Sequence, residues 1–149
     1  MGRKIISTNK KAFGDYHLFD KYVAGIVLTG TEIKSIRKGG VNLKDSFCRL
    51  EELEVFLYNC HISPYEQGNR YNHNAERVRK LLLNKSEINK ILGKIKKENY
   101  TIVPTQLFLE NGWAKLEIAL AKGKKLHDKR DDIAKKSQQR EIERSIKNH

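Results

Sequence analysis

The sequence predicts a mainly β fold with helices: an OB-like antiparallel β-barrel with about three helices and a basic C-terminal tail that is disordered alone. Three observations lead to this prediction. Short apolar runs of strand character, several bounded by turn residues, recur through the chain. A smaller part of the chain follows a helical period instead. The last residues contain hardly any large apolar side chains, so they cannot bury enough surface to offset the cost of ordering them.

A length of 149 residues suits one domain with appendages. We expect residues 1–125 to form the barrel, with a mobile basic arm over residues 1–15, and residues 126–149 to form the tail. Barrel closure is the natural architecture for five or six short strands because it leaves no open sheet edge. The tail contains acid-to-base pairs four residues apart, which favour a helix on a partner; they lie at 131–135, 132–136 and 143–147.

In the first half of the chain, residues 22–28 (YVAGIVL) are predicted to form a strand. Gly25 inside it indicates a bulge or a close backbone approach. A short helix is expected within residues 29–40, with Thr31 as a possible cap and two glycines at its end. Residues 42–62 predict two further strands.

The turn between those two strands is expected near Glu51 and Glu52. In the second strand, alternating side chains are predicted to face opposite sides. Phe56, Tyr58, Cys60 and Ile62 form the first group, and Leu57, Asn59 and His61 form the second.

The second half begins with a helical period over residues 74–98. Asn84 and Glu87 have the spacing of a capping box. The helix after them has one apolar stripe, made of Ile88, Ile91, Leu92 and Ile95. A shorter helix is predicted over residues 75–83 (AERVRKLLL).

A β-hairpin is predicted over residues 101–121. Two apolar runs flank Asn111-Gly112, a dipeptide suited to a two-residue type I′ turn. In the second strand two sets of side chains are expected to face opposite ways. One set is Ala114, Leu116, Ile118 and Leu120, and the other is Trp113, Lys115 and Glu117.

The formal charge is +12 and the pI is near 9.7, which points to a polyanionic partner. Nucleic acid fits better than a membrane, because no stretch approaches the length of an apolar spanning helix. The N-terminal residues lack the apolar run of a signal peptide. Cys48 and Cys60 suit two reduced, buried thiols in the cytoplasm, with a disulfide between them as the alternative.

Motifs for catalysis or metal binding do not emerge from the spacing. No phosphate-binding loop motif is present in the sequence. Cys60 and His61 are adjacent, and in a strand they would face opposite ways, so a metal site is the weaker interpretation. The carboxylates near Glu51 are better explained by a solvated turn. No cofactor is expected, and nothing argues for an enzyme. Five aromatic residues are candidates for stacking on unpaired bases: Tyr16, Tyr22, Tyr65, Tyr71 and Trp113.

Several long motifs resemble the SsrA-binding protein family, also called small protein B. They are NKKAFGDY (9–16), AGIVLTGTEIKSIRKGGVNLKDSF (24–47), ISPYEQGN (62–69), RKLLLNKSEI (79–88), VP (103–104) and AKGKKLHDKR (121–130). The similarity runs in order along nearly the whole chain, and the motifs around residues 31–37 and 121–130 are the most specific.

This resemblance implies an OB-like barrel that binds the tRNA-like domain of transfer-messenger RNA. It implies trans-translation, in which that RNA is delivered to stalled ribosomes. The C-terminal tail is then expected to become helical in the empty mRNA channel near the decoding centre. The protein would be a monomer when free, with transfer-messenger RNA and the ribosome as its partners.

The resemblance also assigns roles to single residues. An RNA-binding role is implied for Asn9, Lys10, Lys11, Glu32, Lys34, Arg37, Asn42, Lys122, Gly123, Lys124 and Lys125. A role near the decoding centre is implied for His127, Asp128, Lys129 and Arg130. Glu32 would accept hydrogen bonds from a guanine edge, whereas its alternative role is that of an acid at a helix N-terminus. Leu81, Leu82 and Leu83 are expected to pack beneath the RNA face.

Two other classes of function are compatible with a basic barrel. One is an RNA-processing enzyme, which would need a catalytic cluster. The other is a permanent structural protein of the ribosome. A ribosome-rescue adaptor is the preferred hypothesis, because it accounts for both the barrel and the tail.

Overall fold

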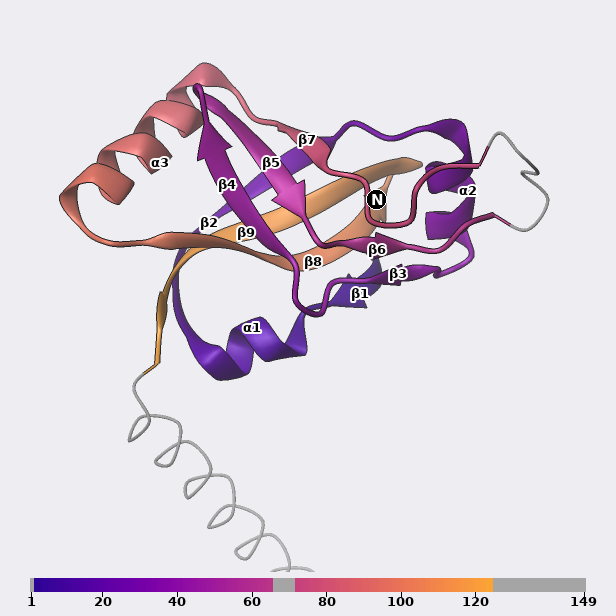
Figure 1. Cartoon of the computed structure of the whole chain (residues 1–149), viewed down its shortest axis with the longest axis horizontal. Helices are drawn as coiled ribbons and strands as arrows, with labels where there is room; N and C mark the ends of the chain where they lie inside the picture. The colour runs from indigo at the N-terminus through magenta and orange to yellow at the C-terminus, as the bar shows by residue number, and fades with distance from the viewer. Residues whose placement is uncertain (1, 66–71, 125–149) are drawn as a thin grey trace, which may run out of the picture.

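The computed structural model describes residues 2–65 and 72–124, and this part of the chain contains nine strands and three helices (Figure 1). The helices are α1 (Lys10–Asp15), α2 (Gly30–Arg37) and α3 (Lys85–Lys97). The strands are β1 (Lys4–Thr8), β2 (Tyr16–Ile26), β3 (Val41–Asn42), β4 (Phe47–Glu51), β5 (Glu54–Tyr58), β6 (His61–Ile62), β7 (Arg79–Leu82), β8 (Thr101–Glu110) and β9 (Trp113–Gly123).

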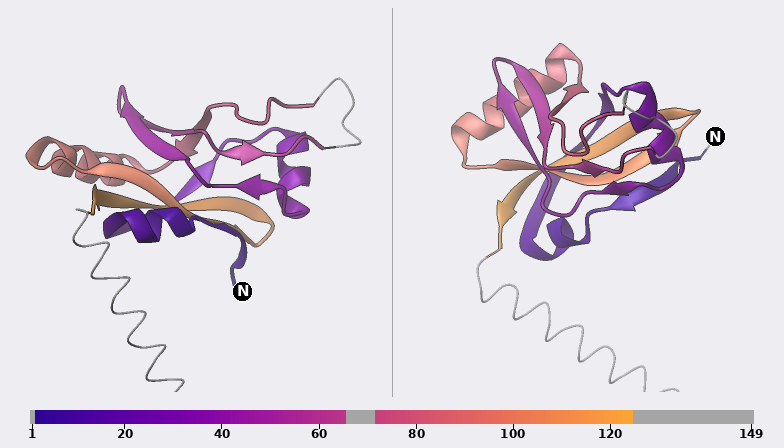
Figure 2. Two further views of the ribbon diagram at one scale, coloured as in Figure 1. Left: turned by 60° about the horizontal axis from the view of Figure 1, so that its bottom comes forward. Right: turned by 45° about the vertical axis from the view of Figure 1, so that its right-hand side comes forward.

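Antiparallel pairing closes the main sheet into a ring. The strands follow the order β1-β8-β4-β5-β7-β2-β9, and β9 pairs again with β8. Strand β8 holds three partners: β9 along its whole length, β1 at its second half and β4 at Ile102. The short strands β3 and β6 form a separate pair. Helices α2 and α3 lie at opposite ends of the ring, whereas α1 lies against its lower side (Figure 2). The predicted antiparallel β fold with three helices is therefore confirmed.

The predicted hairpin of β8 and β9 is also confirmed. Asn111 and Gly112 have φ values of 53° and 82°, as a type I′ turn requires. Leu116, Ile118 and Leu120 of β9 are buried in the main core. Alternation of side chains along this strand therefore places its apolar face inside the ring.

The β4–β5 hairpin turns where the sequence predicts it, at Glu52 and Leu53, which both have positive φ. The predicted alternation beyond it is wrong. Val55 and Leu57 are the buried residues of β5, whereas the next buried residue is Cys60. Asn59 has a φ of 59°, and this left-handed residue reverses the phase of the pattern.

Helices α2 and α3 both begin with a capping box. In α3 it is the predicted pair, Asn84 with Glu87. In α2 the cap is Thr29 rather than Thr31, and its partner is Glu32. The end of α2 matches the prediction, because Gly39 adopts a left-handed φ of 81°.

Two predicted segments are different in the structure. Residues 1–15 are not a mobile arm in their described part, since β1 pairs with β8 and α1 follows it. The helix expected over residues 75–83 is instead β7, an interior strand between β5 and β2. The consecutive leucines are compatible with a strand, because Leu81 faces the core and Leu82 faces outward.

Close packing explains Gly25. A Cβ atom at this position would lie 3.2 Å from the Cβ of Leu82 on the paired strand, so the predicted close backbone approach is confirmed. The irregular register of β2 occurs elsewhere, between Leu18 and Lys21. Cys48 and Cys60 are both buried free thiols. Burial raises the pKa of Cys60 to about 11, which leaves it a thiol at neutral pH.

Candidate nucleic-acid interface

Asn9 fixes the start of α1 on the sheet. Its Oδ1 accepts a hydrogen bond from Ala12 N at 3.2 Å, and its Nδ2 donates to Pro104 O at 2.9 Å. Only 4% of the residue is exposed. Because the side chain is both buried and engaged, the predicted RNA contact by Asn9 does not fit this structure. Asn9 instead positions the two exposed lysines that follow it.

Those lysines, Lys10 and Lys11, line a groove with residues from β3 and the loop after it. Asn42 and Lys44 form the other side of this groove. The Lys11 Nζ atom lies 2.8 Å from Asp45 Oδ1, and this hydrogen bond raises the pKa of Lys11 and lowers that of Asp45. The structure thus brings Lys10 and Lys11 close to Asn42, which is more than thirty positions further along the sequence. All three predicted residues are exposed, and Lys44 joins them.

Helix α2 presents a second basic surface. Lys34 and Arg37 are both exposed, as an RNA-contacting role requires. The Nζ atoms of Lys34 and Lys38 lie 5.5 Å and 5.0 Å from the ring centroid of Tyr65. This geometry is a cation–π arrangement that keeps two lysines beside an aromatic ring.

Glu32, in the same helix, is completely buried. One carboxylate oxygen accepts hydrogen bonds from Thr29 N at 2.8 Å and from Arg77 at 2.6 Å, while the other accepts from Arg79. The predicted contact between this carboxylate and an RNA base does not fit the structure. The alternative, an acid at a helix N-terminus, describes its position correctly.

Arg79 completes this buried cluster, and the sequence analysis did not identify it. Its side chain is 0% exposed and also donates to the carbonyls of Cys60 at 2.8 Å and Ala75 at 3.1 Å. Burial alone raises the pKa of Glu32, but hydrogen bonds from Arg77, Thr29 N and Arg79 outweigh it and hold the pKa below its ordinary value. The cluster ties α2 to β7 and to the chain after β5.

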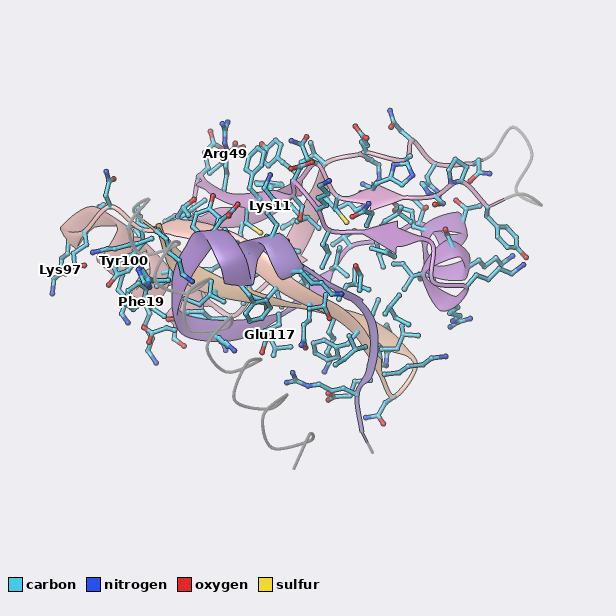
Figure 3. All side chains as sticks on the ribbon, turned by 90° about the horizontal axis from the view of Figure 1, so that it is seen from below. Lys11, Phe19, Arg49, Lys97, Tyr100 and Glu117 are labelled. Carbon is cyan, nitrogen blue, oxygen red and sulfur yellow. The ribbon has the colours of Figure 1, made fainter. Side chains whose placement is uncertain are left out.

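The end of β9 provides the third basic surface, beside the end of α1. Lys122 Nζ donates to Glu98 Oε2 at 2.6 Å and lies 4.7 Å from the ring centroid of Tyr100. Tyr100 in turn meets Phe19 edge to face, with ring centroids 5.3 Å apart (Figure 3). Phe19 is an exposed aromatic residue that the sequence did not reveal as a candidate. Its contact with Tyr100 joins residues 81 positions apart, so it exists only in the folded chain.

Gly123 and Lys124 continue from Lys122. Gly123 pairs with Tyr16 and is exposed, and a Cβ atom there would meet nothing within 4 Å. Packing within the described protein therefore does not require a glycine. Lys124 N donates to Asp15 O at 2.8 Å, and its Nζ lies 3.5 Å from Phe13 O. Both contacts place this lysine along α1.

The remaining predicted residues have simpler outcomes. Lys125, His127, Asp128, Lys129 and Arg130 lie outside the described residues, as does Tyr71. Trp113 is 73% exposed at the tip of the β8–β9 hairpin, whereas Tyr16, Tyr22 and Tyr65 are partly buried.

Within residues 2–65 and 72–124, no cluster of three or more His, Cys, Asp or Glu side chains could hold a metal ion. Cys60 is buried, and the neighbouring His61 side chain is 46% exposed. In that same part of the chain, none of the helices has the length and apolar character needed to cross a membrane.

Comparison with known proteins shows which family this chain belongs to. The family model described as SmpB protein matches residues 6–148. SsrA-binding proteins of Geobacillus thermodenitrificans and Halothermothrix orenii are each 60% identical over 144 residues, which cover 97% of this chain and 93% of theirs. The chain belongs to the SmpB family of SsrA-binding proteins.

A solved structure agrees with this assignment. It comes from work on tmRNA-SmpB and the centre of the bacterial ribosome. The matching chain is 43% identical to this one, with a TM-score of 0.66, and the match covers 80% of this chain and 84% of the other.

Proposed function

We propose that this protein binds the tRNA-like domain of transfer-messenger RNA and delivers that RNA to stalled ribosomes for trans-translation. The observation that carries the proposal is the family match over residues 6–148, which includes both the ring of strands and the basic C-terminal segment. The related structure of tmRNA-SmpB supports the same partners. The formal charge of +12 suits a protein that binds RNA phosphates.

In this proposal the ring holds the RNA through three basic surfaces. The contacting residues are Lys10, Lys11, Lys34, Arg37, Asn42, Lys122, Gly123, Lys124 and Lys125. Asn9 and Glu32 act indirectly, since each is buried and holds a helix that carries exposed lysines. The protein acts as an adaptor in the cytoplasm and not as an enzyme.

Residues 1–125 and 126–149 have separate tasks in this proposal. The first unit binds the RNA, and the second enters the empty mRNA channel, where His127, Asp128, Lys129 and Arg130 lie near the decoding centre. The C-terminal unit holds seven Lys and Arg residues against five acidic ones, which suits a site made of ribosomal RNA.

Sequencing of the RNA that copurifies with the tagged protein tests the partner. One dominant RNA species with a tRNA-like fold is expected. The protein itself should be recovered with ribosomes only in substoichiometric amounts. Stoichiometric recovery with ribosomes would instead indicate a structural ribosomal protein.

Truncation after Lys125 tests the division of tasks. The shortened chain should bind the tRNA-like domain with nearly unchanged affinity but fail to support peptide tagging on stalled ribosomes. Loss of RNA binding by the truncated protein, with its circular dichroism spectrum of folded strands retained, would contradict the division.

A further inference from the structure

The outer face of the β4–β5 hairpin carries a group of aromatic residues that the three basic surfaces do not include. Phe47 pairs directly with Tyr58, and Arg49 pairs with Phe56. Residues directly opposite in an antiparallel pair share one face of the sheet. The intervening residues, such as Leu57, are buried in the core, so this group faces outward.

The group is already assembled as a stack of planar side chains. The rings of Phe47 and Tyr58 are parallel to within 4°, with centroids 5.3 Å apart. The Arg49 guanidinium lies 5.3 Å from the Phe47 centroid and 5.5 Å from the Tyr58 centroid. The Tyr58 hydroxyl donates to Glu51 Oε1 at 2.7 Å, which fixes the orientation of its ring. Aromatic rings and a planar guanidinium are the groups on which unpaired bases stack.

One lysine, Lys11, lies on one side of this surface, where it is paired with Asp45. Phe47 and Arg49 line a hollow whose opposite wall includes Lys11 of α1, and Figure 3 labels Arg49 and Lys11 on this side of the molecule. Asn9 and Lys11 line both this hollow and the groove between α1 and β3. A nucleotide could place its base on the rings and its phosphate near Lys11.

Acidic residues lie on the other side. Glu51, Glu52 and Glu54 surround the turn of the hairpin. These carboxylates repel phosphate, so a bound strand is expected to reach the rings from the Lys11 side. The surface would then hold a short segment rather than a long single strand.

We propose that Phe47, Tyr58 and Arg49 form a stacking site for an unpaired base of the transfer-messenger RNA. This inference rests on the proposed function, because it assumes that this RNA is the ligand. It adds a contact that recognises an unstacked base, whereas the lysines recognise phosphates. A paired helix would offer no free base face, so the site favours a loop or bulge.

The double variant Phe47→Leu with Tyr58→Leu tests the site in the full-length protein. Its affinity for a labelled tRNA-like domain should fall about tenfold, or about 1.4 kcal/mol. The slope of log affinity against log salt should stay unchanged, because stacking releases no counterions. Tyr58→Phe keeps both rings and should bind as the unaltered protein does. Arg49→Lys keeps the charge but loses the planar group, so a smaller loss with an unchanged slope is expected.

Three outcomes would overturn the inference while leaving the proposed function intact. They are equal binding by the double variant and the unaltered protein, a loss accompanied by a shallower salt slope, and a loss of ribosome binding alone. Failure of the unaltered protein to bind the RNA would instead refute the proposed function.

A second measurement avoids reliance on a variant that could misfold. RNA substituted with 4-thiouridine is crosslinked to the unaltered protein, and the modified peptides are mapped. Crosslinks to residues 47–58 are expected. Crosslinks confined to other segments, from an RNA whose loops all contain the photoactive base, would exclude the site.

Discussion

The molecule contains two sets of ion pairs with the same chemistry and opposite surroundings. Glu32 and Arg79 are both fully buried, and Arg79 is also bound to backbone carbonyls. Lys11 with Asp45 and Lys122 with Glu98 are exposed, each with 40% or more of both side chains open to water. Removing one partner of a buried pair leaves an unpaired charge that water cannot reach, which strongly destabilises the fold. An exposed pair contributes little to stability.

This difference separates the charged residues that maintain the fold from those that are able to bind RNA. The buried cluster holds α2, β7 and the chain after β5 in one arrangement, and so it can affect RNA binding only through the fold. The exposed lysines can exchange a carboxylate for a phosphate at little cost, because water already solvates both groups. The proposed RNA contacts therefore belong to the exposed set.

The largest effect is expected for Arg79→Ala, which leaves Glu32 buried without its fully buried partner. The free energy of unfolding should fall by about 3–5 kcal/mol, as measured by urea denaturation. Arg77→Ala is the matched control, since Arg77 also binds Glu32 but its side chain is 35% exposed. Its loss should be clearly smaller. Equal losses for both variants would remove the distinction between buried and exposed partners.

The pH dependence of stability should also report the buried cluster. The pKa of Glu32 in the folded protein lies below its ordinary value of 4.5. Its ionised form therefore stabilises the fold fully above that ordinary value, and this stabilisation is lost as the pH falls through the lower, folded pKa. Urea denaturation at a series of acidic pH values should show this loss. Glu32→Gln should flatten that part of the curve, and an unchanged curve would place the titration elsewhere.

Lys11→Ala should show the reverse of the Arg79 result. The free energy of unfolding should change by less than about 1 kcal/mol, since the pair is exposed. Binding of the tRNA-like domain should weaken, and the salt slope should fall by about one phosphate contact. Fluorescence anisotropy at several salt concentrations measures both. A large loss of stability would assign Lys11 to the fold instead.

Asp45→Asn should have the smallest effect, and in the opposite direction. It removes the carboxylate that competes with phosphate for Lys11. The affinity for RNA should rise by a small factor while stability stays nearly the same. Weaker RNA binding by this variant would mean that Asp45 holds Lys11 in position rather than competing for it.

Local features of the fold could be predicted from the sequence, and distant partnerships could not. Asn111-Gly112 and the pair Asn84 and Glu87 each act over a few residues, so they predict a turn and a helix start correctly. The role of Glu32 depends on Arg79, which is 47 positions away. Residues 4–8 form a strand because β8 offers an edge near residues 106–109, and composition alone suggests a basic arm.

The candidate site shows the same limit. The basic residues could be identified from motifs, because their charge and exposure do not depend on a partner. The aromatic surface of Phe47 and Tyr58 could not, since it requires the register of β4 against β5. Phe19 likewise meets Tyr100 only in the folded ring.

The three partners of β8 have a consequence for synthesis of the protein. Strand β8 occupies residues 101–110, yet it pairs with β1 at the beginning of the chain and with β4 in the middle. These strands keep unpaired edges until most of the polypeptide has left the ribosome, and such edges are prone to aggregation. Ring closure is therefore a late, non-local step. A nascent chain that ends before residue 101 should remain protease-sensitive, whereas one that includes β9 should become resistant.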